Sequence, residues 1–354
     1  MLLADLLGKM VSQDASDLFL KADTPPTYKV SGETIQEHAR LSPMDVERLA
    51  YAVMGDEQQV EFVRTNEMNL AFNYPELGRF RCNIYRQRGT IGIVFRRVKA
   101  QIPNVADLDL PPILNELVMD KRGLILVVGA TGSGKSTTLA AMLNHRNETA
   151  GGHIITIEDP IEFVYKDKKA IISQREVGID TEAYDAALKN ALRQAPDVIL
   201  IGEMRDTESV SASIYFAETG HLVLSTLHST NAFQAIERML QFYPGEMHSQ
   251  ILMQLSLNLK AIISQRLIPR ADGNGRVAAV EVMLVTPRIK DLIKKGEISQ
   301  IRGAIQAGSK DGLQSFEQAL HELYTKNMIT LDDAMAAADS ANDLRLRIKG
   351  MATL

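Results

Sequence analysis

Residues 129–137 read GATGSGKST, which matches the spacing G-x-x-x-x-G-K-[ST]. In such a loop the backbone N–H groups surround phosphate oxygens, the lysine reaches the β- and γ-phosphates, and the hydroxyl after it binds Mg²⁺. An apolar run precedes the loop and a helical pattern follows it, a setting that places phosphate at a helix N-terminus. We therefore predict a nucleoside triphosphate site with Mg²⁺ on Ser136 and with these binding residues: Gly129, Ala130, Thr131, Gly132, Ser133, Gly134, Lys135, Ser136 and Thr137.

Acidic residues follow two apolar runs that we expect to form buried parallel strands. The first run, IITIEDPIEF at 154–163, leads into three acids, and the second, VILIGEMRD at 198–206, leads into Glu203 after a glycine. Ligand groups in an open α/β sheet lie at the carboxyl ends of its strands, so we expect these acids at one edge. We interpret Arg205 and Asp206 as structural, with Asp206 as the N-cap of the next helix.

Hydrolysis of a triphosphate needs a fixed metal ion and a water aligned with the γ-phosphate. We predict that Glu203 is a metal ligand that holds Mg²⁺ through its water shell, and that Glu162 is the general base. Gly202 stands where P-loop proteins commonly carry aspartate, and we interpret Glu158 and Asp159 as carboxylates that take over its role. The alternative for Glu158 and Asp159 is a polar strand end that faces solvent.

Two histidines bracket the run HLVLSTLH at 221–228. His228 follows the apolar part, so we expect it at the carboxyl end of a strand, where a γ-phosphate sensor would lie. His221 precedes the strand and would bond a strand end or a neighbouring carboxylate. A lone histidine is also common as a structural group, and both interpretations of His228 remain open.

A cationic segment at 78–99 contains no acid. Its cations are Arg79, Arg81, Arg86, Arg88, Arg96, Arg97 and Lys99. The alternation of a strand places Arg79 and Arg81 on one face and Phe80 and Cys82 on the other. This cationic segment has two simple interpretations, a solvated face of a sheet and a patch that binds nucleic acid. We favour a third, in which Arg81 and Arg96 reach the triphosphate of a neighbouring subunit as arginine fingers.

The composition is that of a globular protein. The 354 residues are 45% hydrophobic and 23% charged, and the net charge of −5 gives no general attraction for nucleic acid or anionic membrane. The single cysteine excludes an internal disulfide and a four-cysteine zinc site. The N-terminus lacks the pattern of a signal peptide, and no apolar run approaches the length of a membrane span. We expect a cytoplasmic protein.

Four segments of the chain differ in pattern. Residues 1–99 predict a small α+β domain, and residues 100–112 break both periodicities and predict a linker. Residues 113–285 alternate strand and helix patterns, which predicts an α/β core with a mostly parallel sheet wrapped by helices, and 286–354 are helical. Strands are expected at 16–23, 27–32, 69–74, 78–87, 90–98, 124–129, 153–159, 197–203 and 221–228.

Five stretches occur in order: GATGSGKSTTLAA, TIEDPIEF, ISQREV, LIGEMRD and ETGHLVLSTLHSTNA. In sequence and spacing they resemble the secretion-superfamily ATPases, in particular the PilT/PilU family of type IV pilus retraction ATPases. The resemblance implies a PAS-like N-terminal domain, a RecA-like P-loop ATPase core, ATP and Mg²⁺ as ligands, and a homohexameric ring. It implies functional roles for Lys135, Ser136, Glu162, Glu203, His221 and His228, and roles in trans for Arg81 and Arg96.

Within that family the chain is more similar to PilU-like members. PilT carries an AIRNLIR-type segment, whereas the corresponding stretch here is PRIKDLIKKGE at 287–297. This implies an accessory retraction motor beside a PilT-like paralogue, docked on an inner-membrane platform protein at the cytoplasmic face. Two alternatives are a nucleotide-dependent module that stabilises a partner ring with little turnover, and a DNA-translocating or conjugative secretion ATPase.

Overall fold

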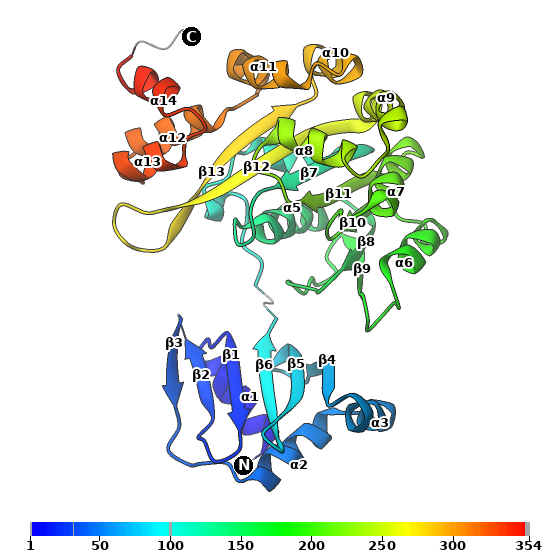
Figure 1. Cartoon of the computed structure of the whole chain (residues 1–354), viewed down its shortest axis with the longest axis vertical. Coiled ribbons are helices and arrows are strands. Elements are labelled where there is room, and N and C mark those ends of the chain that lie inside the picture. Colours follow the sequence, from blue (N-terminus) through cyan, green and yellow to red (C-terminus); the bar gives the residue numbers. More distant parts are fainter. Residues whose placement is uncertain (1, 31, 99–100, 351–354) are drawn as a thin grey trace. The chain divides into compact units, whose positions relative to one another are not determined.

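The computed structural model describes residues 2–30, 32–98 and 101–350 (Figure 1). It divides into two compact units, one formed by 1–101 with 161–164 and the other by 102–160 with 165–354. The expected boundary between 99 and 100, like the cation Lys99, lies outside the described residues. Of the predicted helical segment 286–354, the described residues 286–350 lie in the second unit, and 351–354 lie outside the described residues.

The first unit has a six-stranded sheet in the order β3-β2-β1-β6-β5-β4, and neighbouring strands among these described ones pair antiparallel. Alternate residues of β5 are buried, with Phe80, Cys82 and Ile84 on the inner face, as the alternation predicted. The elements are α1 (Leu3–Ser12), β1 (Asp17–Lys21), β2 (Thr27–Val30), β3 (Glu33–Gln36), α2 (Pro43–Val53), α3 (Asp56–Thr65), β4 (Glu67–Tyr74), β5 (Gly78–Gln87) and β6 (Thr90–Arg97).

The second unit has a seven-stranded sheet in the order β13-β12-β7-β11-β10-β8-β9. Only the β12–β13 pair is antiparallel among these described strands. The strands are β7 (Gly123–Val128), β8 (Gly152–Glu158), β9 (Ala170–Glu176), β10 (Val198–Ile201), β11 (Leu222–Leu227), β12 (Leu259–Pro269) and β13 (Arg276–Leu284). The helices are α4 (Ile113–Leu117), α5 (Lys135–Thr149), α6 (Tyr184–Ala191), α7 (Thr207–Glu218), α8 (Ala232–Leu240), α9 (His248–Asn258), α10 (Pro287–Lys295), α11 (Ile301–Ala307), α12 (Phe316–Thr325), α13 (Leu331–Ala337) and α14 (Ala341–Ile348).

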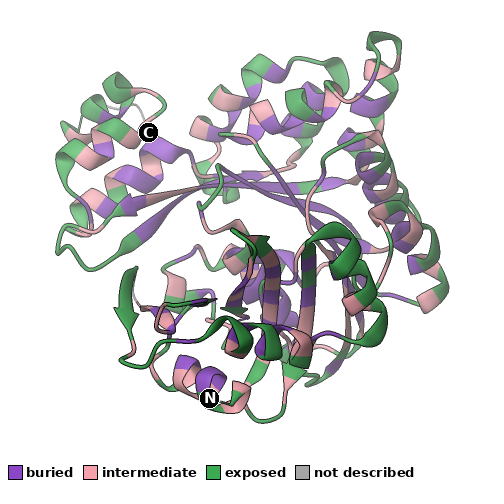
Figure 2. Ribbon diagram, turned by 60° about the horizontal axis from the view of Figure 1, so that its bottom comes forward, coloured by how far each residue is buried: buried purple, intermediate pink, exposed green. Residues whose placement is uncertain are grey.

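Helices cover both faces of this sheet, so its central strands are buried throughout. All residues of β7, β10 and β11 are buried, which explains their continuous apolar runs, and Figure 2 shows the buried colour along the strands. Leu126 belongs to the core with α7, α8 and α9, whereas the adjacent Val127 belongs to the core with α4 and α5. The α/β core predicted from the sequence is confirmed.

Some elements were not predicted. Strand β9 and the β12–β13 hairpin were missed, and so was β3. The hairpin is the platform for the C-terminal helices, because α12, α13 and α14 form a separate small core with it around Phe316. This core lies beside the two yellow strands in Figure 1.

Candidate functional site

The phosphate-loop sequence joins the buried strand β7 to helix α5, as predicted. Gly134 is the residue before the helix and has φ +92°, a left-handed conformation that favours glycine. A Cβ atom there would lie 2.8 Å from the Nε2 atom of Gln265 on β12. The backbone conformation therefore favours glycine, and any larger residue would also have to displace the side-chain amide of Gln265.

Lys135, the first residue of α5, turns its ammonium group back into the loop. Its Nζ donates to the carbonyl oxygens of Gly129 at 2.9 Å and Ala130 at 3.0 Å. Partial burial lowers the pKa of Lys135, and the negative charge of Glu203 opposes that change. Glu203 is thus close enough to the loop to act on its lysine.

Glu203 stands just past the carboxyl end of β10 and is held from two sides. Arg205 donates from Nε to Oε2 at 2.8 Å, and the Nε2 atom of His228 lies 3.1 Å from Oε1. His228 follows β11, which pairs in parallel with β10. The two strand ends therefore bring Glu203 and His228 together, and the side chain of Glu203 is only 19% exposed.

The structure explains the glycine before Glu203. A Cβ atom at Gly202 would lie 2.9 Å from the hydroxyl oxygen of Tyr184 and 3.2 Å from the carbonyl oxygen of Ile157. An aspartate at this position would require these groups to move. Burial raises the pKa of Tyr184, and the charge of Asp159 adds to that effect.

The acids after β8 have partners of their own. Glu158 accepts a hydrogen bond from the Oγ1 atom of Thr156 at 2.6 Å. Asp159 accepts from Nη1 of Arg205 at 3.2 Å, and its peptide bond to Pro160 is cis. Arg205 therefore joins carboxylates from the ends of β8 and β10, a structural role that the sequence analysis anticipated.

Asp206 is the N-cap of α7, as predicted. Its Oδ1 atom accepts from the backbone N–H of Ser209 at 2.8 Å. The cap stands three residues after Glu203 and fixes the start of α7 at Thr207, so the turn that carries Glu203 is anchored at both ends.

His221 lies at the other end of the strand from His228. Six residues of β11 lie between the two histidines, which places them about 23 Å apart along the strand. The Nδ1 atom of His221 lies 3.2 Å from the carbonyl oxygen of Phe216 and 3.1 Å from Oγ1 of Thr219. Within this chain His221 bonds the end of α7 and does not join the cluster around Glu203.

Three further candidates belong to the first unit. Glu162 lies in the segment 161–164 and its side chain is exposed. Arg81 and Arg96 are paired residues on β5 and β6. Arg96 donates from Nε to Oδ1 of Asp17 at 2.7 Å, and the side chain of Asp17 is 6% exposed. Arg96 thus neutralises a buried carboxylate, and the functional roles of Glu162 and the two arginines remain predictions.

Residues of β12 and β13 complete the surroundings of the phosphate loop, and the sequence analysis missed them. A cavity of about 320 Å³ is lined by residues 129–133 together with Thr230, Gln265, Arg266, Leu267 and Arg276. Gln265 also accepts from the Oγ1 atom of Thr138 at 2.7 Å, across 127 residues of sequence. No local pattern marks such residues, because they reach the loop only through strand pairing.

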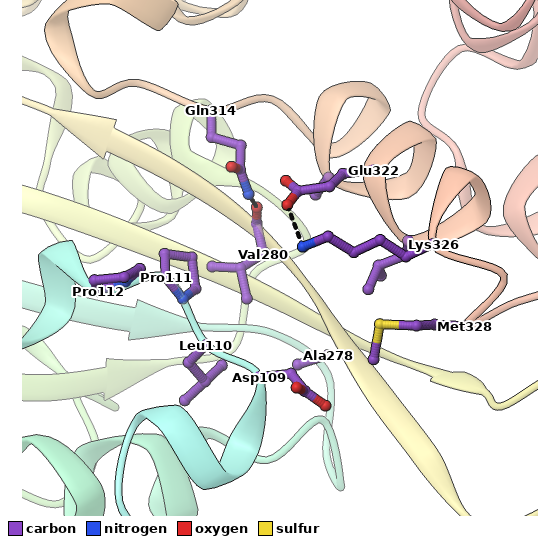
Figure 3. Close-up of a pocket in the computed structure, with 12 residues that line it drawn as sticks. Asp109, Leu110, Pro111, Pro112, Ala278, Val280, Gln314, Glu322, Lys326 and Met328 are labelled. Atoms are coloured by element: carbon purple, nitrogen blue, oxygen red, sulfur yellow. Dashed lines mark hydrogen bonds and ion pairs between the residues drawn. The ribbon is translucent and has the colours of Figure 1, made fainter.

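A second cavity lies where the end of the predicted linker meets the C-terminal helices. It has a volume of about 310 Å³, and Asp109 is one of the residues that line it (Figure 3). The carboxylate of Asp109 pairs with Arg270. Leu110 is buried in the core of the second unit, as is Val105. The linker after Val105 is thus a fixed part of this unit. The other lining residues are Pro111, Pro112, Ala278, Val280, Gln314, Ala319, Glu322, Leu323, Lys326 and Met328.

A strand, phosphate loop and helix at the centre of a mostly parallel sheet, with a carboxylate past the end of β10, two strands along from β7, define a P-loop nucleotide-binding core. Residues 93–328 match the family model for type II/IV secretion system proteins. The chain belongs to this family, in its PilT/PilU group of type IV pilus ATPases. Among the described residues, no helix combines the length and apolar character that a bilayer span requires.

Relatives match nearly the whole chain. The type IV pilus ATPase PilU of Pseudomonas aeruginosa is 49% identical over 97% of this chain and 90% of its own length. The retraction ATPase PilT of the same organism is 41% identical over 95% of this chain and 98% of its own. A crystal structure of the pilus retraction motor PilT with bound ADP has a TM-score of 0.91 and 41% identity, with 98% and 99% of the two chains covered.

Proposed function

We propose that this protein is an ATP-hydrolysing motor that powers type IV pilus retraction. The observation that carries the proposal is the placement of Glu203, which acts electrostatically on Lys135 of the phosphate loop and contacts His228 from the next strand. The similarity to PilU and PilT over nearly the full chain supports the biological assignment.

The residues of this chain suit the chemistry of the γ-phosphate. The N-terminus of α5 and the ammonium group of Lys135 would bind phosphate oxygens. His228 keeps the carboxylate of Glu203 oriented, and Arg205 holds it from the other side. Glu162 is the proposed base that takes the proton from the attacking water.

Mg²⁺ fits the donors that the site offers. Ser136, in the first turn of α5, carries an exposed hydroxyl group, and Glu203 supplies a carboxylate. Oxygen donors of this kind suit Mg²⁺, which retains water and usually binds only one or two protein groups beside phosphate. Ser136 would hold the ion directly and Glu203 through water, and the ion would neutralise charge on the phosphates.

We further propose a homohexameric ring in which Arg81 and Arg96 act on the nucleotide of a neighbouring subunit. The arginines lie on adjacent strands, so both would approach one phosphate group together. Val105 and Leu110 are fixed in the second unit, so a hinge between the two domains would lie before Val105. His221, which is remote from the cluster around Glu203, would act in structure or at a subunit boundary.

The PilU-like accessory role is the finer proposal. It is supported by the higher identity to PilU, at 49%, than to PilT, at 41%. In this role the protein would work with a PilT-like motor, at an inner-membrane platform protein on the cytoplasmic side. A nucleotide-dependent partner with little turnover of its own is the second candidate. DNA translocation has less support because the net charge is −5.

ATPase assays with the purified full-length chain test these proposals. Lys135→Ala should reduce turnover at least 100-fold, because the phosphates lose their cationic partner. Lys326→Ala, which breaks a surface ion pair with Glu322 of α12, serves as the control. Light scattering at several dilutions gives the oligomeric state, and the activity per subunit should fall as the ring dissociates. Stimulation of ATPase activity by DNA would favour DNA translocation, and stimulation by a PilT-like protein would favour the accessory role. Equal turnover in wild type and Lys135→Ala would refute the proposed hydrolase.

A further inference from the structure

We infer that Asp339, in the C-terminal region, is a positioning residue for the nucleotide cavity and acts through Arg266. The inference rests on the proposed function, because it assumes that the cavity beside the phosphate loop receives part of the nucleotide. Asp339 lies between α13 and α14 and is 18% exposed. Through this residue the C-terminal helical region would help to set the affinity of the site for nucleotide.

Arg266 connects the cavity to these helices. It lies on β12 next to Gln265 and lines the cavity together with residues 129–133 of the phosphate loop. Its Nη2 atom pairs with Oδ1 of Asp339, and its Nη1 atom donates to the carbonyl oxygen of Ala337. The guanidinium carbon also stands 3.9 Å from the ring centroid of Phe316. The cation is thus held by an acid, a carbonyl and an aromatic face, all from the C-terminal helical region.

The same acid also reaches the segment that follows His228. The Nδ2 atom of Asn231 donates to Oδ2 of Asp339 at 3.4 Å, and Arg266 donates to the carbonyl oxygen of Thr230 at 3.2 Å. Asn231 is the N-cap of α8. Asp339 therefore holds the lining residue Arg266 and also contacts Asn231, which follows the lining residue Thr230.

Loss of this carboxylate would leave the guanidinium group of Arg266 without one of its hydrogen-bond acceptors. The guanidinium would then sample other directions, including the cavity, and Asn231, next to Thr230, would lose its hydrogen bond to Asp339. Arg266 lines the cavity but does not join the cluster of Glu203 and His228. The expected effect is therefore on nucleotide affinity and not on the chemical step.

The test compares Asp339→Asn with wild type in the full-length protein. We expect KM for ATP and Kd for a fluorescent ADP analogue to rise about 5-fold or more, with kcat changed less than 2-fold. Asp339→Glu retains the charge and should recover most of the affinity. Glu322→Gln breaks the ion pair with Lys326 on α12 and should leave both constants unchanged.

A double-mutant cycle separates positioning from a general loss of structure. Arg266→Lys keeps the charge but not the planar fork, so it should also weaken ADP binding. If Asp339 acts through Arg266, the combined variant should be little weaker than the worse single variant, whereas additive effects would overturn the inference. The cycle uses only variants whose melting temperature without nucleotide stays within a few degrees of wild type. If Asp339→Asn fails that criterion, Asp339→Ser replaces it.

The outcomes separate the two proposals. If wild type binds no ADP analogue and hydrolyses no ATP, the proposed function fails and the inference falls with it. If wild type binds and hydrolyses but Asp339→Asn has unchanged KM and Kd, only the inference is wrong. A fall in kcat with unchanged Kd would equally overturn it, because the acid would then act on the chemical step.

Discussion

The Nε2 atom of His228 lies 3.1 Å from the Oε1 atom of Glu203, across the ends of two parallel strands. Glu203 in turn affects the pKa of Lys135 in the phosphate loop. Each of these three side chains lies in a segment that follows a different strand of one sheet: β7, β10 or β11. Their convergence gives the proposed ATPase site its polar centre.

Removal of the imidazole should slow hydrolysis. In His228→Ala the carboxylate of Glu203 loses one of its two holding contacts, so we expect kcat to fall about 10- to 100-fold. His228→Gln, whose Nε2 can donate to the same oxygen, should retain more activity. The control is His321→Ala on α12. A His228→Ala enzyme with wild-type kcat would show that this contact does not serve the reaction.

Substitution of Gly202 tests the steric explanation for the missing aspartate. Gly202→Ala should destabilise the protein by about 1–3 kcal/mol, because its Cβ atom meets the hydroxyl of Tyr184 and the carbonyl of Ile157. Tyr184→Phe removes the first of these contacts and should recover part of the loss. Urea denaturation of the two single variants and the double variant measures the coupling. Strict additivity would show that Tyr184 is not the obstacle.

Glu281 should make stability depend on pH. Burial raises its pKa from 4.5 to about 7, the charge of Asp339 adds to this, and hydrogen bonds from Ala232 and Ser264 and the charge of Arg266 oppose it. A raised pKa in the folded state favours folding below pH 4.5, and this contribution is lost as the pH rises towards 7. Glu281→Gln removes the titration. The stability of wild type relative to Glu281→Gln should therefore fall by up to about 3 kcal/mol between pH 4.5 and 7.5.

Urea denaturation of both proteins across that pH range provides the measurement. The comparison cancels other groups that titrate in the same window, provided that they respond equally in both proteins. A constant difference between the two proteins would mean that the Glu281 carboxyl titrates near its ordinary range. A difference that grows in favour of wild type with pH would reverse the predicted sign.

Arg96 requires a test that separates a structural role from a role in trans. Arg96→Ala leaves the buried carboxylate of Asp17 without its cation and should destabilise the first unit by about 1–3 kcal/mol. The double variant Asp17→Asn/Arg96→Ala should regain most of that stability. If Arg96 also acts on a neighbouring nucleotide, ATPase activity stays low in the double variant. Recovery of activity together with stability would contradict the arginine-finger proposal.

Much of the fold was predictable because its determinants are local. Ser42 and Pro43 mark the start of α2, and the hydroxyl of Ser42 accepts from the N–H of Asp45 at 3.1 Å, three residues away. The apolar runs of β7, β10 and β11 indicated buried parallel strands, and this signal too lies within a few consecutive residues. The polar character of β9, AIISQRE, concealed a strand at the sheet edge.

The phosphate loop, the strand ends that carry Glu203 and His228, and the family could all be predicted from the residues alone, because each depends on residues that are close together in the chain. Three further findings required the folded structure: His221 is remote from that cluster, Tyr184 restricts position 202, and Arg266 joins the cavity to Asp339. Such contacts join segments that are far apart along the chain, as Arg266 and Asp339 are at 73 residues. Strand pairing and core packing bring them together, and no local spacing encodes that result.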